Sequence, residues 1–358
     1  MKKLIRLELR KLFSKRLTQL ALAVVLLLSA FLSYSTYQNK YASDGASHEG
    51  AGRTAVEIDK AVAARYSGIL TDEKVQQMIS EIVPKSGENG LNAIYVYRNT
   101  IQSAISARFS DIYGNWNGLR VSDVFGDEAV KIGYVDGWLS TSKNMTKILT
   151  VFLLFIIVMI APVFCGEYSG VDQILLSSKY GRTKCAAAKV TASVLAAVMT
   201  SIVVLAVNFL MAFAFYGSEG LDCSILFAQL TYIEGGIPFN ITCGTLLAYQ
   251  AILAVTGAIG VVAITLIFSA ACKNQMIALV ASAAVYTLPL LFPVTETSAL
   301  FRLVALLPPY HAQFVSLMSV GQMSGVLLYA IWAVPVAMIL AVIGSVVSRR
   351  IFAKHQVS

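Results

Sequence analysis

The chain has 358 residues, of which 57% are hydrophobic and 13% are charged, and its net charge is +8. Ordinary soluble domains carry about 25% charged residues, so this composition excludes a soluble globular protein and predicts an integral membrane protein. The positive charge does not indicate nucleic-acid binding, because the basic residues concentrate beside apolar runs, where they mark the cytoplasmic ends of membrane spans.

Residues 1–16 are predicted to form a basic amphipathic helix on the cytoplasmic side, since seven lysines and arginines precede Leu17. The apolar stripe at i, i+4, i+7 and i+8 consists of Ile5, Leu9, Leu12 and Phe13. Such a helix lies in the headgroup plane of the membrane and can border a partner protein. The same charges are also explained by a basic flank that only orients the first span. We expect no cleavable signal, because no small-residue cleavage site follows the apolar run.

Residues 17–37 are predicted to form the first transmembrane helix, since this charge-free run is long enough to cross a hydrocarbon core of about 30 Å. The basic flank places the far end of the helix outside. Residues 38–146 then form an extracellular domain, whose apolar residues recur mostly with helical periodicity. Its candidate helices are Arg53–Tyr66, Thr71–Val83 and Leu91–Phe109.

Residues 147–347 are predicted to contain five more transmembrane helices and the loops between them. The expected helices are Lys147–Cys165, Cys185–Tyr216, Gly244–Ser269, Met276–Phe292 and Val326–Val347. Residues 348–358 form a basic cytoplasmic tail, so that both termini lie inside. The expected fold class is therefore an all-α integral membrane protein of six spans, with a mostly helical extracellular domain between the first two. Small residues such as Gly257 in the fourth span permit close helix contacts.

Two of the five cysteines, Cys223 and Cys243, lie in or beside the predicted outer connection Gly217–Thr242. A disulfide between them is allowed by this topology. Its formation depends on loop geometry, which the spacing does not determine. Free thiols are therefore the alternative.

The segment 166–189 is polar, is punctuated by Gly, and lies between two long charge-free runs. Val171, Ile174 and Leu175 are spaced i, i+3, i+4, which predicts one face of a short helix. Its basic residues are Lys179, Arg182, Lys184 and Lys189. They place the segment on the cytoplasmic side, where a short amphipathic helix can dock another protein. An ordinary basic loop is the other interpretation.

This segment resembles the intracellular coupling region of type-2 ABC exporter permeases, the family of antibiotic, bacteriocin-peptide and polysaccharide exporters. In that family the second span ends at an acidic residue, which is followed by a Gly, an apolar helix, a turn of small residues, an Arg, and a Lys that opens the third span. The matching residues here are Glu167, Gly170, Ile174, Leu175, Leu176, Ser177, Ser178, Arg182 and Lys189. Val171 stands where that family commonly has Thr, and a frequent Pro of the turn is absent.

The resemblance implies a permease that exports its substrate with energy from ATP. Such a permease pairs with a second copy, here expected to be identical, and with two cytoplasmic ABC ATPase subunits that bind ATP and Mg, so this chain would itself hold no cofactor. The implied ATPase contacts are Glu167, Tyr168, Gly170, Val171, Ile174, Leu175, Leu176 and Arg182. Glu167 would pair with an arginine of the ATPase, or it would only cap a helix N-terminus. The location would be the bacterial cytoplasmic membrane, with lipids as further partners.

Motifs for catalysis and for metal binding are absent from the sequence. No Gly is followed by Lys, which excludes a GxxxxGK[ST] phosphate loop and places ATP hydrolysis in a separate subunit. The three histidines, His48, His311 and His355, lack the spacing of a metal site, and no GxSxG elbow occurs. The predicted spans hold almost no ionisable side chain, which argues against an ion-coupled carrier. We therefore expect neither an enzyme nor a metal protein.

The substrate class and the rival functions stay open at the level of sequence. The mostly apolar spans favour an amphipathic or hydrophobic substrate, such as a secreted or antimicrobial peptide. The extracellular domain would equally suit a membrane sensor or immunity protein that binds an antimicrobial peptide without transporting it. Neither tail is long enough for a signalling domain, which disfavours the sensor. A membrane-embedded enzyme is a weaker third alternative, because no catalytic constellation is present.

Overall fold

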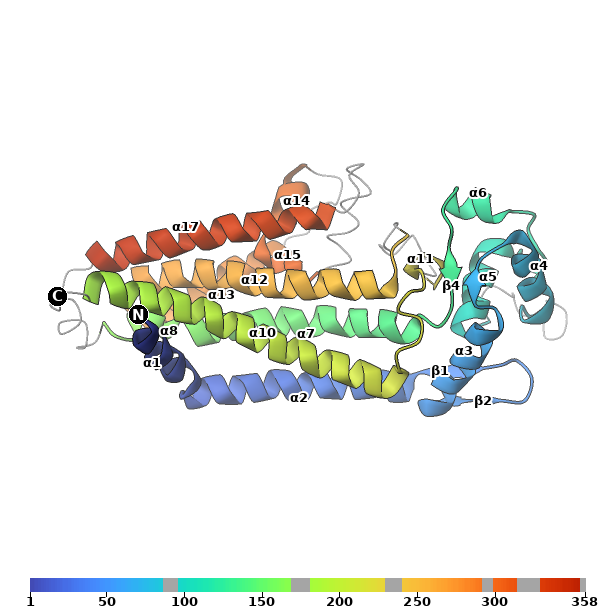
Figure 1. Cartoon of the computed structure of the whole chain (residues 1–358), viewed down its shortest axis with the longest axis horizontal. Coiled ribbons are helices and arrows are strands. Elements are labelled where there is room, and N and C mark those ends of the chain that lie inside the picture. Colours follow the sequence, from blue (N-terminus) through green and yellow to red (C-terminus); the bar gives the residue numbers. More distant parts are fainter. Residues whose placement is uncertain (86–95, 169–180, 229–239, 292–298, 314–328, 355–358) are drawn as a thin grey trace. The chain divides into compact units, whose positions relative to one another are not determined.

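The computed structural model describes residues 1–85, 96–168, 181–228, 240–291, 299–313 and 329–354 (Figure 1). The chain divides into two compact units. Unit 1 contains Met1–Ser29, Met145–Val207 and Tyr249–Ser358. Unit 2 contains Ala30–Asn144 and Asn208–Ala248. Four long helices, α2, α7, α10 and α12, contribute residues to both units.

Five of the described helices are long and apolar enough to cross a membrane. They are α2 (Arg16–Asn39), α7 with α8 (Asp136–Ile160 and Pro162–Cys165), α10 with the π-helical turn before it (Ala186–Tyr216 and Gly181–Cys185), α12 (Cys243–Ala271) and α17 (Ala333–Lys354). A further apolar helix, α13 (Gln275–Leu291), has 17 residues. The described chain is thus a mostly helical, membrane-embedded protein. The six predicted spans fall on these five helices and α13.

Two of the helices extend beyond the ends that the apolar runs predict. Helix α7 begins at Asp136 instead of near Lys147, because it continues through polar residues, and an acidic side chain in the first turn suits a helix N-terminus. Helix α17 ends at Lys354 instead of Val347, so part of the predicted cytoplasmic tail is helical. The expected start of the last span, Val326, lies outside the described residues.

Close helix contacts in unit 1 depend on glycines. A Cβ added at Gly344 of α17 would lie 2.6 Å from the carbonyl oxygen of Ala263 in α12. A Cβ added at Gly257 of α12 would lie 2.7 Å from the Cβ of His311, which belongs to α15 (Pro308–His311). Both distances are too short for non-bonded atoms, so only Gly fits at these two positions.

We expect Gly344→Leu to destabilise unit 1 by about 2 kcal/mol, within the range for overpacked sites. The obstructing atom belongs to the backbone of α12 and cannot rotate away. The matched control is Val342→Leu, at a side chain that is 63% exposed, and it should leave the stability unchanged. The measurement is the thermal unfolding midpoint of the detergent-solubilised chain. Equal midpoints for the two variants would contradict the close approach of α12 and α17.

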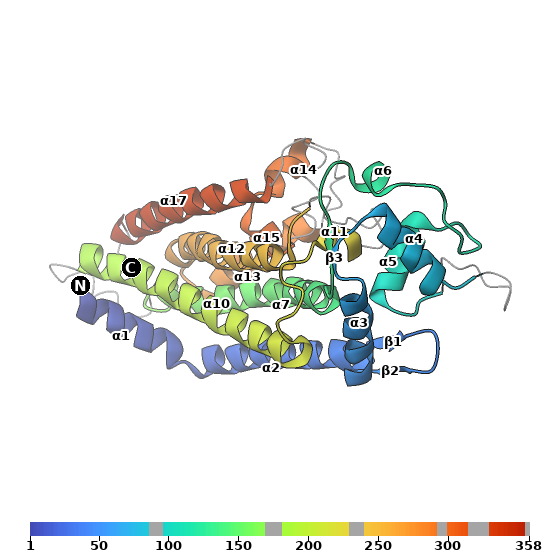
Figure 2. The same ribbon diagram turned by 45° about the vertical axis from the view of Figure 1, so that its right-hand side comes forward.

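Unit 2 contains most of the predicted extracellular domain (Figure 2). Its short elements are β1 (Tyr41–Ser43), β2 (Glu49–Ala51), α3 (Arg53–Arg65), β3 (Gly68–Ile69), α4 (Asp72–Glu81), α5 (Thr100–Phe109), α6 (Val121–Phe125), β4 (Lys131–Ile132) and α11 (Ile225–Ala228). Strand β1 pairs antiparallel with β2, and β3 pairs antiparallel with β4. Helix α5 begins at Thr100 instead of the predicted Leu91. The side chain of Asn99 caps it by accepting a hydrogen bond from the Gln102 backbone N–H at 2.9 Å.

Aromatic side chains join the ends of the long helices that belong to unit 2. Tyr37 of α2 stacks on Phe215 of α10 with ring centroids 4.5 Å apart. Trp138 of α7 meets Phe213 of α10 edge-on at 5.3 Å, and its indole N–H donates to the Glu219 carbonyl at 2.7 Å. These contacts bury large apolar surfaces and satisfy the polar end of the indole. They hold α2, α7 and α10 together within the unit.

Cys223 and Cys243 are buried free thiols in the structure. The two residues are nevertheless close along the backbone. Ser224 and Thr242 form an antiparallel bridge, and beside it the backbone N–H of Cys243 donates to the Cys223 carbonyl at 3.0 Å. Backbone hydrogen bonds therefore close the connection between α10 and α12 without a covalent link.

Candidate functional site

The candidate site lies in unit 1, where helix α1 (Lys2–Phe13) lies beside the beginning of α10 (Figures 1 and 2). The apolar stripe of α1 faces the unit. Leu12 is buried, and the other stripe residues, Ile5, Leu9 and Phe13, are half-buried. Leu7, on another face of α1, is 62% exposed. The stripe therefore packs mainly against the chain itself, and a different set of apolar side chains faces outward.

Four charged residues form a cluster between α1, the turn after α8, and α10. The members of this charge cluster are Glu8, Lys11, Glu167 and Lys189. The Nζ atom of Lys189 lies 2.7 Å from Glu167 Oε1 and 3.3 Å from Glu8 Oε2. It also donates to the Val163 carbonyl at 3.2 Å. Lys11 pairs with the same Oε1 atom of Glu167. One carboxylate oxygen therefore links α1 to α10.

Burial makes this cluster a strong constraint. The side chains of Lys189 and Glu167 are only 1% and 6% exposed, whereas that of Lys11 is 52% exposed. A buried charge without a partner is costly, so the position of Lys189 requires its acidic partners. Burial opposes ionisation of the Glu167 carboxyl, but Lys189 and Lys11 outweigh it and hold the pKa of Glu167 below its ordinary value. Glu167 is therefore ionised at neutral pH and forms an ion pair with each of the two lysines.

Aromatic stacking and one helix cap anchor the residues on either side of the segment 169–180. The hydroxyl of Tyr168 donates to the Ala270 carbonyl at 2.8 Å, and its ring stacks on Phe352 of α17 at 6.2 Å. On the other side, Arg182 donates to the carbonyl of Ala353 at 2.7 Å. This carbonyl is in the last turn of α17, where a cation is favourable. Tyr168 and Arg182, which flank the segment, are therefore tied to long apolar helices.

The structure places Glu167 in contact with two lysines of its own chain. Its carboxylate is buried and binds Lys11 and Lys189, while its pairing with an arginine of the ATPase stays a prediction. Arg182 likewise binds a carbonyl of α17. Five predicted contacts lie outside the described residues: Gly170, Val171, Ile174, Leu175 and Leu176.

Sequence reasoning missed Glu8, Lys11 and Phe352 as members of this site. Two signals were present. Glu8 is the only acidic residue among the first 16, and Lys189 follows three alanines at the start of a charge-free run. A lysine at the edge of a long apolar helix is costly to bury unless an acidic side chain pairs with it. No comparable signal marks Phe352, because its partners come from distant helices.

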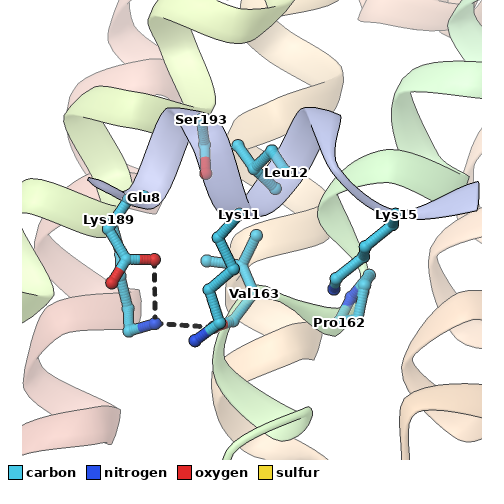
Figure 3. A pocket seen from close by; sticks show the side chains of 8 residues that line it. All are labelled: Glu8, Lys11, Leu12, Lys15, Pro162, Val163, Lys189 and Ser193. Atoms are coloured by element: carbon cyan, nitrogen blue, oxygen red, sulfur yellow. Dashed lines mark hydrogen bonds and ion pairs between the residues drawn. The ribbon is translucent and has the colours of Figure 1, made fainter. Parts of the chain in front are cut away.

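A small cavity lies beside the charge cluster (Figure 3). Its lining residues are Glu8, Lys11, Leu12, Lys15, Pro162, Val163, Lys189 and Ser193. Its volume of about 10 Å³ is no more than one water molecule requires. The described residues hold no group of three or more His, Cys, Asp or Glu side chains suited to a metal ion.

Comparisons with known proteins give no identification. No family model matches the chain, and no curated protein and no solved structure is significantly similar to it. The residues of the chain and their contacts are therefore the basis for assigning its function.

Proposed function

We propose that the chain is the permease subunit of an ATP-driven ABC exporter. In this proposal it has six spans with both termini in the cytoplasm, and residues 38–146 form an extracellular domain. It works as a homodimer with two separate ATPase subunits in a bacterial cytoplasmic membrane. The observation that carries the proposal is the anchoring of the described residues on either side of the predicted coupling helix. Glu167 and Tyr168 fix the chain before this segment, and Arg182 fixes it after.

The contacts of the site provide a physical route for force from the ATPase. ATP binding would close the two ATPase subunits and push on the segment 169–180. The push would enter α12 and α17 through Tyr168, α10 through the pair of Glu167 with Lys189, and α17 also through Arg182. Because these connections are ion pairs, an aromatic stack and a helix cap, the helices would move as linked bodies rather than absorb the displacement.

The composition of the spans supports a hydrophobic or amphipathic substrate. The longest helices consist almost entirely of apolar and small side chains, which offer few groups for binding an ionic solute. A secreted or antimicrobial peptide is the substrate class that we propose first. The extracellular domain would then border the exit of the transport path.

The predicted coupling helix can be tested by Leu175→Asp. Leu175 occupies the middle of the predicted apolar face, so an aspartate there would bury an unpaired charge in the ATPase interface. We expect binding of the ATPase to weaken by about 30-fold or more, as for other central interface residues. The measurement is the amount of ATPase that co-purifies with each variant.

The matched control is Ile69→Asp, at an exposed position in unit 2, which should leave co-purification unchanged. The thermal unfolding midpoint of the permease should be the same for both variants, because neither alters the packing of the spans. Normal assembly of the complex with Leu175→Asp would show that this segment is not the ATPase contact.

A further inference from the structure

Two polar groups that line the cavity have no partner among the described residues. The Oγ atom of Ser193 is buried and makes no hydrogen bond. Lys15 is half-buried, and its side chain points into the cavity (Figure 3). Within the described part of the chain, no acceptor or carboxylate lies within bonding distance of the Lys15 ammonium. A buried hydroxyl and a half-buried ammonium without partners are both costly, so the site is built for something that accepts hydrogen bonds.

The local charges favour an anion in this role. Lys11, Lys15 and Lys189 line the cavity together with Glu8, and Glu167 pairs with two of these lysines. Three positive charges therefore face two negative ones. Burial and the repulsion from Lys11 and Lys189 lower the pKa of Lys15. An anion beside Lys15 would remove this repulsion and supply the missing acceptor.

The elements that carry or flank Glu8, Lys11 and Lys15 also expose large apolar side chains. Leu7 of α1 is 62% exposed, and Leu17 and Leu20 at the start of α2 are 65% and 66% exposed. Leu17 directly follows Lys15 and Arg16 in the chain. Apolar side chains next to basic ones are the pattern of a helix at the boundary between headgroups and acyl chains. An anion that carries hydrocarbon chains fits this boundary better than a free ion.

We propose that the mouth of this cavity binds the phosphate of an anionic membrane lipid, with Lys15 and Ser193 donating hydrogen bonds to its oxygens. The cavity has room for only one oxygen atom, so the phosphorus atom would stay at the mouth. The acyl chains would run along Leu17 and Leu20. A bound lipid would fasten α1 to the charge cluster. This inference rests on the proposed function only in that α1 lies at the cytoplasmic surface of the membrane. Its test requires no ATPase.

The test is a titration of the full-length, detergent-solubilised chain with short-chain phosphatidylglycerol, followed by the thermal unfolding midpoint. We expect phosphatidylglycerol to raise the midpoint and phosphatidylcholine at the same concentration to leave it unchanged. Lys15→Gln should weaken the apparent affinity about five-fold, the effect of one lysine near an anionic headgroup. Ser193→Ala should raise the midpoint without lipid, because it removes an unpaired hydroxyl, and should reduce the response to lipid.

Lys3→Gln is the matched control, since it removes the same charge from an exposed position of α1. It should leave the response nearly unchanged. If Lys3→Gln and Lys15→Gln weakened the apparent affinity for phosphatidylglycerol equally, the lipid would be held only by general charge attraction. That result would overturn the proposed site. An equal response to phosphatidylcholine would also overturn it. A midpoint shift of the same size with inorganic phosphate alone would assign the site to free phosphate instead of lipid.

Discussion

Lys189→Met is expected to destabilise unit 1 by about 3 kcal/mol, the lower end of the range for breaking a buried ion pair. The substitution preserves most of the shape of the side chain. It leaves Glu167 with Lys11 as its only described cationic partner, and it removes the ammonium from Glu8. The measurement is the thermal unfolding midpoint of the solubilised chain. Lys184→Met, at an exposed position before α10, is the control and should change the midpoint little.

A double variant tests whether charge pairing is the cause of this loss. Buried ion pairs can be replaced by apolar side chains at little cost, and the remaining Glu8 and Lys11 are 18% and 52% exposed. We therefore expect Glu167→Leu combined with Lys189→Met to recover most of the midpoint that Lys189→Met loses. A double variant that is less stable than Lys189→Met would mean that packing, not charge, holds this site together.

The loss of stability in Lys189→Met should depend on pH, because the Glu167 carboxyl titrates. Its pKa is held below the ordinary value of 4.5, because Lys189 and Lys11 outweigh the effect of burial. A carboxyl whose pKa falls on folding stabilises the fold above its unfolded pKa, and this contribution is lost as the pH falls through the folded pKa. The difference in midpoint between wild type and Lys189→Met should therefore narrow below about pH 4.5.

Lys40→Met is expected to have the largest effect in unit 2, about 3–5 kcal/mol. Lys40 follows α2, and its ammonium pairs with Asp59 of α3 and with Asp136 at the start of α7. The side chains of Lys40 and Asp59 are only 9% and 2% exposed. Without the ammonium, the two carboxylates would lie near each other with no compensating cation from the described part of unit 2. The thermal midpoint and hydrogen exchange of α3 measure the loss.

The pH profile and a matched control separate this effect from a general loss of packing. Burial and the charge of Asp136 raise the pKa of Asp59 even with Lys40 in place. Removing Lys40 should raise that pKa further, so the variant should recover stability as the pH falls through the raised pKa and Asp59 takes up a proton. Lys60→Met is the control, because Lys60 pairs at 3.5 Å with Glu219, which is 66% exposed. If Lys40→Met and Lys60→Met lowered the thermal unfolding midpoint equally, the buried ion pairs of Lys40 would stabilise unit 2 no more than an exposed ion pair does.

The approximate positions of the long helices were predictable from the sequence, because a helix in lipid requires a long run of apolar residues. Their ends were less predictable. Helix α7 continues through polar residues from Asp136, and α17 continues to Lys354, where Arg182 binds its last turn. The strands β1 to β4 have only two or three residues each. This is too short for a pattern of alternating side chains to appear.

The charge cluster could not be derived from spacing, because its members are far apart in the chain. Glu8 and Lys189 are 181 residues apart, and Lys11 and Glu167 are 156 residues apart. Such pairs follow from the way in which helices pack and not from local periodicity. The resemblance to exporter permeases did single out Glu167 and Lys189. It gave no indication that these two side chains pair with each other or that Lys11 shares the same carboxylate.

The most direct test of the proposed function is purification of the chain from native membranes under mild conditions, followed by mass analysis of the intact complex and its subunits. The permease proposal predicts two copies of this chain with two copies of an ABC ATPase. Recovery of the chain alone, or together with a kinase, would contradict the proposal and favour a membrane sensor that binds its peptide without transporting it.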